Sequence, residues 1–240
     1  MVLAAEEIEA RLRAIATPAR AAREKRYLKS ELDFLGATMP QIRAAVKDVA
    51  RGLTHDELVT LVLALWTKPI HERRTASVLL LARFVGLLEP GDLALIERLV
   101  RDSRTWALVD ALATVVVGGL LGRDPGGVTS VLQRWATDPD FWVRRASLLA
   151  ELRPIREGAP LDRFLARAEP LLEEREFFIR KAIGWVLREA GKRRPDEVAA
   201  WLAPRTHRAS GVTVREAVKY LPSEVSATLV AAYRAGRPAP

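Results

Sequence analysis

Hydrophobic residues recur with a helical period along most of the chain. In residues 4–16, Ile8, Leu12 and Ile15 fall on one face of a helix, because positions three or four apart lie together. Comparable segments of roughly 10–16 residues follow to the end of the chain, separated by short stretches of Pro, Gly and Asp. No convincing alternation of the kind typical of a strand interrupts them. The pattern therefore predicts an all-α protein.

The helix boundaries are marked by residues that cap or break helices. Pro18 is expected to open a helix that reaches about Leu32, and Gly36 to follow as a stop in the left-handed conformation. Thr54 has the capping chemistry of a helix start, and Pro69 lies at the entry of the next helix. Residues 235–240 are expected to form a frayed tail.

An alanine-centred motif recurs at intervals of about 35 residues, with one interval of twice that length. The motif alanines are Ala76, Ala146, Ala182 and Ala217, and Ala111 occupies the place of the skipped unit. This period is typical of HEAT-like helical repeats, which stack side by side. We therefore predict one domain over residues 1–240, a single α-solenoid of about six HEAT-like repeats with a concave basic groove.

The position before each motif alanine carries a polar residue, and tryptophans lie one helical turn from two of these positions. The polar residues are Thr75, Asp110, Arg145, Lys181 and Glu216. Equivalent positions of stacked repeats line the same side of a solenoid. We therefore expect a single groove lined by Trp106, Asp110, Arg145, Lys181 and Trp185, with Arg144 and Arg180 near its edge.

These residues also have structural interpretations. A tryptophan in a helical repeat more often belongs to the core, and a lone Asp110 would usually be a salt-bridge partner of a nearby arginine. The arginine pairs could form a solvated face or bridge consecutive repeats. The shared register of Trp106 and Trp185 with charged residues favours a binding site for those two. The tryptophans that we assign to the core are Trp66, Trp135, Trp142 and Trp201.

The charge balance adds a candidate partner. The 240 residues include 38 Lys and Arg against 30 Asp and Glu, which gives a net charge of +8. Such a surplus favours an anionic partner, with nucleic acid as the first candidate, and arginine suits bidentate contacts with phosphate. Arginine enrichment is also common in high-GC bacterial proteins, so charge alone does not decide between the two explanations.

Several classes of site are excluded or not indicated. The chain has no cysteine, which excludes disulfides, thiolate catalysis and iron–sulfur clusters. Its three histidines are scattered without ligand spacing, so we predict no metal and no cofactor. The acidic N-terminus is unlike a secretory signal, and the longest apolar run, residues 111–122, is short for a membrane span. We expect a cytoplasmic monomer with no membrane partner.

Four segments together resemble one known family. Residues 177–189, Phe-Phe-Ile-Arg-Lys-Ala-Ile-Gly-Trp-Val-Leu-Arg-Glu, look like the signature helix of the AlkD-type bacterial DNA alkylation repair family, whose members are HEAT-repeat DNA glycosylases. Residues 26–40, with Arg-Tyr-Leu-Lys, Phe-Leu-Gly and a proline, resemble its N-terminal motif. Residues 141–146 match its Trp-x-x-Arg-Ala segment, and residues 106–110 match its Trp and Val-Asp element. The likeness covers nearly the whole chain, in order.

The resemblance implies a glycosylase that removes cationic alkylated purines, such as 3-methyladenine and 7-methylguanine, from double-stranded DNA in base excision repair. It implies that the damaged base stays in the duplex rather than being flipped into a pocket. Catalytic roles carry over to Trp106, Asp110 and Trp185, with Asp110 stabilising the sugar cation and positioning water. A phosphate contact carries over to Arg145. The other predicted DNA-binding residues are Tyr27, Lys29, Arg144, Arg180, Lys181 and Arg188.

Two other functions remain open. Thr105 and Ala107 stand where the family pattern has a Trp and an Asp, which favours a non-catalytic HEAT-repeat protein that binds DNA structures. That protein would bind DNA with steep salt dependence and would release no base. A protein-binding HEAT scaffold would show no affinity for DNA at moderate salt. An assay of base release together with DNA binding therefore separates the three hypotheses.

Overall fold

The computed structural model describes residues 1–47, 49 and 51–236, and it divides into two compact units, Met1–Val116 and Val117–Pro240. Each unit is described by itself. Within the described residues, the regular elements are helices, and one isolated bridge pairs Asp33 with Ile70. The all-α prediction is therefore confirmed, whereas the single domain over residues 1–240 stays a prediction.

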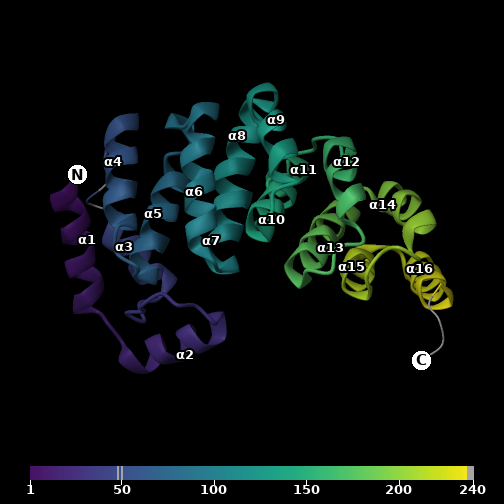
Figure 1. Ribbon diagram of the computed structural model, residues 1–240, viewed down its shortest axis with the longest axis horizontal. Helices are drawn as coiled ribbons and strands as arrows, with labels where there is room; N and C mark the ends of the chain where they lie inside the picture. Colours follow the sequence, from purple (N-terminus) through teal and green to yellow (C-terminus); the bar gives the residue numbers. More distant parts are fainter. Residues whose placement is uncertain (48, 50, 237–240) are drawn as a thin grey trace. The chain divides into compact units, whose positions relative to one another are not determined.

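Unit 1 is built from helices whose boundaries largely follow the predicted punctuation (Figure 1). They are α1 (Val2–Ala14), α2 (Pro18–Leu28), α3 (Met39–Lys47), α4 (His55–Trp66), α5 (His71–Arg83), α6 (Leu93–Ser103) and α7 (Trp106–Ala111). A π-helical segment, Leu112–Val117, follows α7. Helices α4 and α5 pack against each other and carry fully buried leucines, among them Leu61 and Leu80.

Three boundary residues in unit 1 show how the local sequence shapes the chain. Thr54 caps α4 as predicted, because its side chain accepts a hydrogen bond from the backbone N–H of Glu57 while the Glu57 carboxylate bonds back to Thr54. Helix α2 ends at Leu28, earlier than predicted, since Lys29 adopts the left-handed conformation with φ 47°. Gly36 has φ +80° as expected, but it closes a loop instead of a helix.

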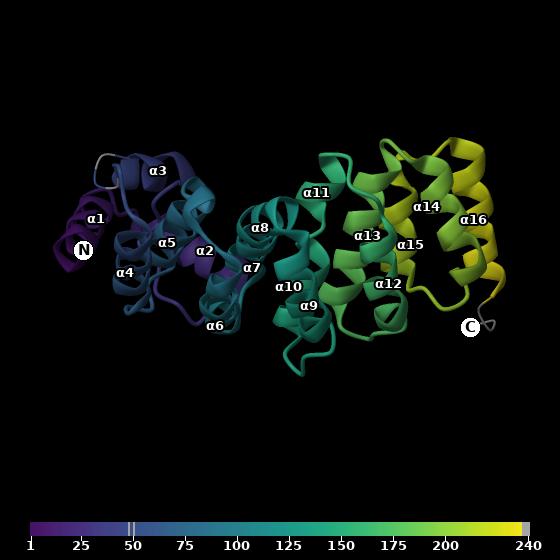
Figure 2. The ribbon, with the colours of Figure 1, turned by 90° about the horizontal axis from the view of Figure 1, so that it is seen from above.

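Unit 2 continues the helical repeat pattern, and Figure 2 shows α13 beside α10 and α15. Its helices are α8 (Gly118–Arg123), α9 (Pro125–Trp135), α10 (Phe141–Leu149), α11 (Leu152–Arg156), α12 (Asp162–Leu171), α13 (Phe177–Gly191), α14 (Pro195–Leu202), α15 (Gly211–Ala217) and α16 (Ser223–Ala235). Helix α13 approaches α15 so closely that a Cβ atom at Gly184 would lie 2.6 Å from the Cβ atom of Glu216. This glycine therefore permits the packing of two successive repeats.

The repeating alanine motif marks the core of both units. Ala76, Ala146, Ala182 and Ala217 are all fully buried, as the repeat register predicts. Trp66, Trp135 and Trp142 are buried as assigned, but Trp201 is half-buried, and the guanidinium of Arg205 lies 4.8 Å from its ring centroid. The small motif residue thus lets neighbouring helices approach, which is the usual role of alanine at such a contact.

One helical segment is longer than the apolar run seen in the sequence. Trp106–Arg123 forms 18 consecutive helical residues that are apolar enough, by length and composition, to cross a membrane. Half of this window is buried inside the protein, and core helices of soluble proteins meet the same criterion. It is therefore weak evidence for a membrane span. At the C-terminal end, α16 continues to Ala235, and residues 237–240 of the predicted tail lie outside the described residues.

Candidate functional site

The first part of the candidate site in unit 1 is an aromatic pair between α2 and α7. Trp106 is the first residue of α7 and is half-buried. The ring of Tyr27, which is 72% exposed, meets the indole edge-to-face with a centroid distance of 6.1 Å. The two residues were predicted separately as DNA-binding and catalytic, and the structure brings them together within one unit.

The loop after α2 is held by a buried carboxylate that sequence reasoning missed. Glu72, fully buried in the first turn of α5, accepts hydrogen bonds from the backbone N–H groups of Leu35, Gly36 and Ala37 at 2.9, 2.6 and 3.3 Å. Leu35 in turn accepts a hydrogen bond from the N–H of Thr17, just before α2. Both ends of α2 are therefore tied to the same loop, which fixes Tyr27 beside α7.

Asp110 lies one helical turn after Trp106 in α7. Leu108 and Val109, between them, are buried in the core, as predicted, whereas Asp110 and Trp106 are partly exposed. The backbone carbonyl of Asp110 accepts a hydrogen bond from the Thr114 hydroxyl at 2.7 Å, at the entrance to the π-helical segment. A carboxylate and an indole on the outer side of one helix can both stabilise positive charge in a bound molecule.

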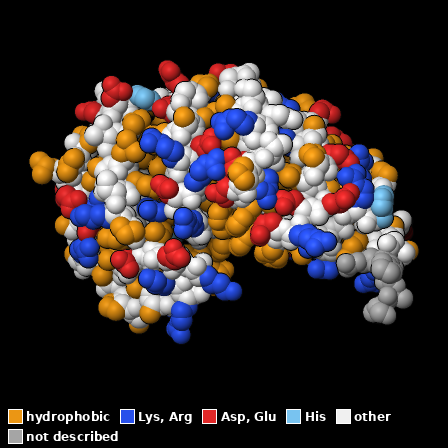
Figure 3. Space-filling model, in the orientation of Figure 1, with side chains coloured by type: hydrophobic (Ala, Val, Ile, Leu, Met, Phe, Trp, Pro, Cys, Tyr) orange, Lys and Arg blue, Asp and Glu red, His pale blue; other side chains and the backbone are white. Residues whose placement is uncertain are grey.

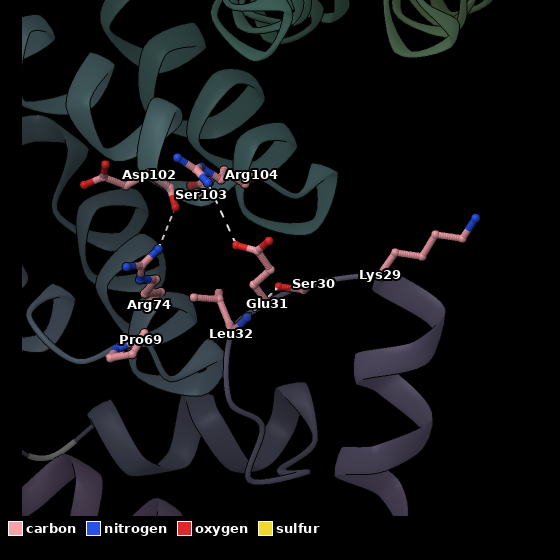
Figure 4. A pocket seen from close by; sticks show the side chains of 9 residues that line it. All are labelled: Lys29, Ser30, Glu31, Leu32, Pro69, Arg74, Asp102, Ser103 and Arg104. Atoms are coloured by element: carbon pink, nitrogen blue, oxygen red, sulfur yellow. Dashed lines mark hydrogen bonds and ion pairs between the residues drawn. The ribbon is translucent and has the colours of Figure 1, made fainter.

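An open hollow of about 580 Å³ lies next to the turn that precedes α7 (Figure 4). Arg74 reaches across it and donates to the carbonyl of Asp102 at 2.6 Å, and burial lowers the pKa of this guanidinium. Arg104 lies 3.9 Å from the carboxylate of Glu31, while the Lys29 side chain extends away from the hollow. Arg104 and Lys29 are therefore exposed cations near Trp106, and only Lys29 was predicted.

In unit 2, the predicted DNA-binding arginines of the edge hold a loop of the protein itself. Arg144 donates to the Glu174 carboxylate at 2.9 and 3.1 Å and to the carbonyl of Asp138 at 2.6 Å. Arg180 donates to the carbonyl of Glu174 at 2.6 Å. These bonds span consecutive repeats, which agrees with the structural alternative for the arginine pairs. On the face shown in Figure 3, cationic side chains likewise lie among carboxylates.

Arg145 is only 3% exposed, in contrast to the open position that the register predicted. Its guanidinium donates to the backbone carbonyl of Phe178 at 2.5 Å and lies 5.6 Å from the Phe178 ring centroid. Phe178 also packs against Trp142 with a centroid distance of 4.7 Å, and exposed Phe177 contacts it edge-to-face. The position before the motif alanine thus faces the next repeat, so a phosphate contact by Arg145 stays a prediction.

Lys181 and Arg188 of α13 converge on one carboxylate in α15. Glu216 is 7% exposed and accepts hydrogen bonds from Lys181, Arg188 and Lys219 at 2.7, 2.5 and 2.8 Å. Burial opposes ionisation of this carboxyl, but the hydrogen bonds and charges of the surrounding cations outweigh it and lower its pKa to about 2. Trp185, one turn after Lys181, is half-buried.

The structure thus brings the predicted residues together in separate sets: Tyr27 with Trp106 in unit 1, and the cations of α10 and α13 in unit 2. The groove that would combine these sets stays a prediction. Among the residues that the structure describes, no group of three or more His, Asp or Glu is arranged to hold a metal ion.

Comparisons with known proteins give a consistent family. The family model described as DNA alkylation repair enzyme matches residues 8–221. A solved structure of a predicted DNA alkylation repair enzyme from Enterococcus faecalis has a TM-score of 0.79 and 24% identity, over 87% of this chain and 97% of that one. AlkD2 from Streptococcus mutans has a TM-score of 0.62 and 15% identity, over 85% and 98% of the two chains. The structure of smu.31 from Streptococcus mutans UA159 gives 0.61 and 15%, over 84% and 98%. A search of curated proteins finds no match.

Proposed function

Because the chain belongs to the family of DNA alkylation repair enzymes, we propose that it is a DNA glycosylase for cationic N3- and N7-alkylated purines in duplex DNA. The observation that carries this proposal is the pairing of Asp110 with Trp106 on the outer side of α7, beside exposed Tyr27. Since the protein acts on DNA in this proposal, we expect it in the bacterial cytoplasm, as a monomer. The reaction needs neither metal nor cofactor.

The chemistry begins with a leaving group that is already activated. An alkylated purine carries a positive charge, so its N9 atom can leave with the electron pair of the glycosidic bond without a general acid. The base departs as a neutral molecule, and positive charge develops on the deoxyribose. Water adds to C1′ and loses a proton to the solvent, which leaves an abasic site. The task of the protein is therefore to stabilise a sugar cation and to orient water.

Asp110 has the right chemistry for that task. A carboxylate held close to a developing oxocarbenium ion lowers the barrier electrostatically, as in glycoside hydrolysis but with a single acid. The indoles of Trp106 and Trp185 would add cation–π attraction to the sugar, each worth about 0.5–2 kcal/mol. In this proposal the base stays in the duplex, and both sets of residues act on the same DNA.

The cations around the site would hold the DNA backbone. Lys29 is exposed and is available for phosphate directly. Arg144, Arg145, Arg180, Lys181 and Arg188 would have to exchange or share their present partners, Glu174, the Phe178 carbonyl and Glu216, with phosphate oxygens. Each phosphate neutralised on duplex DNA would lower log K by about 0.9 per tenfold rise in salt.

The decisive experiment is release of free 7-methylguanine and 3-methyladenine from methylated duplex DNA by the intact protein and by Asp110→Asn. We expect the variant to lose activity by a factor on the order of 10²–10³ while its DNA affinity, measured by fluorescence anisotropy, is unchanged. Asp162→Asn, which changes an exposed carboxylate at the start of α12, serves as the matched control and should retain full activity.

A non-catalytic protein that binds DNA structures is the second candidate. It is favoured by Thr105 and Ala107 in place of the Trp and Asp of the family pattern, and by the acidic partners that already occupy the cations of unit 2. DNA binding without base release by the intact protein would establish this alternative. A lack of DNA binding at moderate salt would instead favour the protein-binding scaffold.

A further inference from the structure

A second hollow in unit 1 lies beside Trp106, under helix α2. It has a volume of about 290 Å³ and is lined by side chains of α2, α3, α5 and α7, including Tyr27, His71, Thr75 and Trp106. Helix α2 has no buried residue of its own, so it covers this space without filling it. Ligand pockets of drug-sized molecules are roughly 300–1,000 Å³, and a space at the lower end suits a single ring system.

The walls of this hollow contain polar atoms that lack partners. The hydroxyl of Thr75, a residue that is only 7% exposed, is buried and makes no hydrogen bond, and neither does Nδ1 of His71 or Nε of Arg20. Eight side-chain atoms among the described residues share this condition, and these three all line the one hollow. Buried polar groups in native proteins are almost always satisfied, so the concentration here points to an additional molecule.

The electrostatics of the hollow favour an uncharged guest. His71 stacks on Phe34 with a centroid distance of 4.5 Å, and burial lowers its pKa to about 4, so the imidazole is neutral at pH 7. The single cation on the wall, Arg20, is paired with Glu24 at 2.5 Å. Most of the remaining wall is apolar, and the Tyr27 and Trp106 rings suit a flat aromatic molecule.

We propose that this hollow binds the neutral purine that the reaction releases. The inference rests on the proposed function for the source of the purine, but the pocket itself is a separate site from the carboxylate of Asp110. Breaking the glycosidic bond returns the electron pair to the base, so a cationic substrate becomes an uncharged product. The ring nitrogens of that product match the unpartnered atoms, because a threonine hydroxyl and a neutral imidazole each donate or accept a hydrogen bond.

The test is direct binding of free purines to the full protein without DNA. Titration with adenine and with 3-methyladenine, followed by calorimetry, should give a dissociation constant of roughly 10 µM to 1 mM for ligands of about ten heavy atoms. Affinity should change little between about 50 and 200 mM salt, in contrast to DNA binding. Adenosine 5′-monophosphate, which is larger and charged, should bind at least tenfold more weakly.

Two variants of the wall locate the binding. Thr75→Val keeps the side-chain shape and removes the hydroxyl, and it should weaken purine binding by about two- to tenfold. Ala107→Phe places a ring in the hollow and should abolish the binding. The matched controls are Thr137→Val and Ala166→Phe, which alter exposed positions of unit 2 and should bind purines like the intact protein. Thermal unfolding of each variant verifies that it folds, and Thr75→Val decides the matter if Ala107→Phe does not.

The outcomes separate this inference from the proposed function. Base release from methylated DNA without any purine binding at millimolar concentration would overturn the pocket and leave the glycosylase standing. Purine binding that Thr75→Val weakens, in a protein that releases no base, would support the pocket and remove the glycosylase. Purine binding that neither wall variant alters would place the purine elsewhere and overturn the inference.

Discussion

Replacement of Glu216 by glutamine tests how the repeats of unit 2 are joined. The carboxylate is nearly buried and receives Lys181, Arg188 and Lys219, which together hold its pKa at about 2 instead of 4.5. A shift of this size corresponds to about 3 kcal/mol of stability at neutral pH. Because Lys181 and Lys219 are themselves well exposed to solvent, screening reduces the expected loss to about 2 kcal/mol.

The loss should appear in urea denaturation at pH 7 as a lower midpoint with an unchanged slope. A carboxyl group with a lowered pKa contributes stability above pH 4.5, and this contribution is lost as the pH falls through 4.5 toward 2. The difference between Glu216→Gln and the intact protein should therefore shrink over that range. Glu173→Gln, at an exposed carboxylate that pairs with Arg208, should cost less than about 0.5 kcal/mol.

The same variant has a consequence for DNA binding. Without the carboxylate, Lys181 and Arg188 are released for phosphate, so each new contact should steepen the salt dependence of log K by about 0.9 on duplex DNA. A variant as stable as the intact protein to within 0.5 kcal/mol, or a stability difference that does not vary between pH 5 and pH 2, would refute the reasoning about Glu216.

The remaining predictions concern packing and protonation. Gly184→Ala should destabilise the protein by about 1–3 kcal/mol in chemical denaturation, because its Cβ would lie 2.6 Å from that of Glu216, whereas Gly122→Ala, with only an ordinary contact at 3.6 Å, should be neutral or stabilising. Equal effects of the two substitutions would contradict this account. Burial lowers the pKa of His71 to about 4, so its contribution is complete above pH 6.5 and is lost as the pH falls from 6.5 to 4, by about 3 kcal/mol in total. His71→Leu should flatten the acid-denaturation profile over this interval, and an unchanged profile would show that His71 does not titrate in this way.

The helical pattern and the small core residues could be predicted from the sequence, because both depend on local spacing. The cap at Thr54 and the buried motif alanines follow from such local rules. The register also contained a clue that was not used: Lys181 and Glu216 occupy equivalent positions in consecutive repeats and have opposite charge, and they form an ion pair. Opposite charges at equivalent positions indicate a bridge between repeats as much as a shared surface.

Other features depend on contacts that local spacing does not reveal. The Glu72 carboxylate binds backbone N–H groups of residues 35–37, which carry no side-chain signature of that bond. The burial of Arg145 depends on a backbone carbonyl at Phe178, and carbonyl groups are present at every position of any sequence. The hollow beside Trp106 arises because α2 bridges a space that its own side chains do not fill.

The residue before the motif alanine gives each junction between repeats of unit 2 a different chemistry. Arg145 joins a carbonyl of the next repeat, whereas Lys181 joins the carboxylate of Glu216. The repeats are therefore not interchangeable modules. Duplicating the repeat that contains Lys181 would set one lysine against another at the new junction, and deleting the repeat of Glu216 would leave two cations without their acid. Lengthening or shortening this array, in evolution or by engineering, requires a compensating change of charge at every new junction.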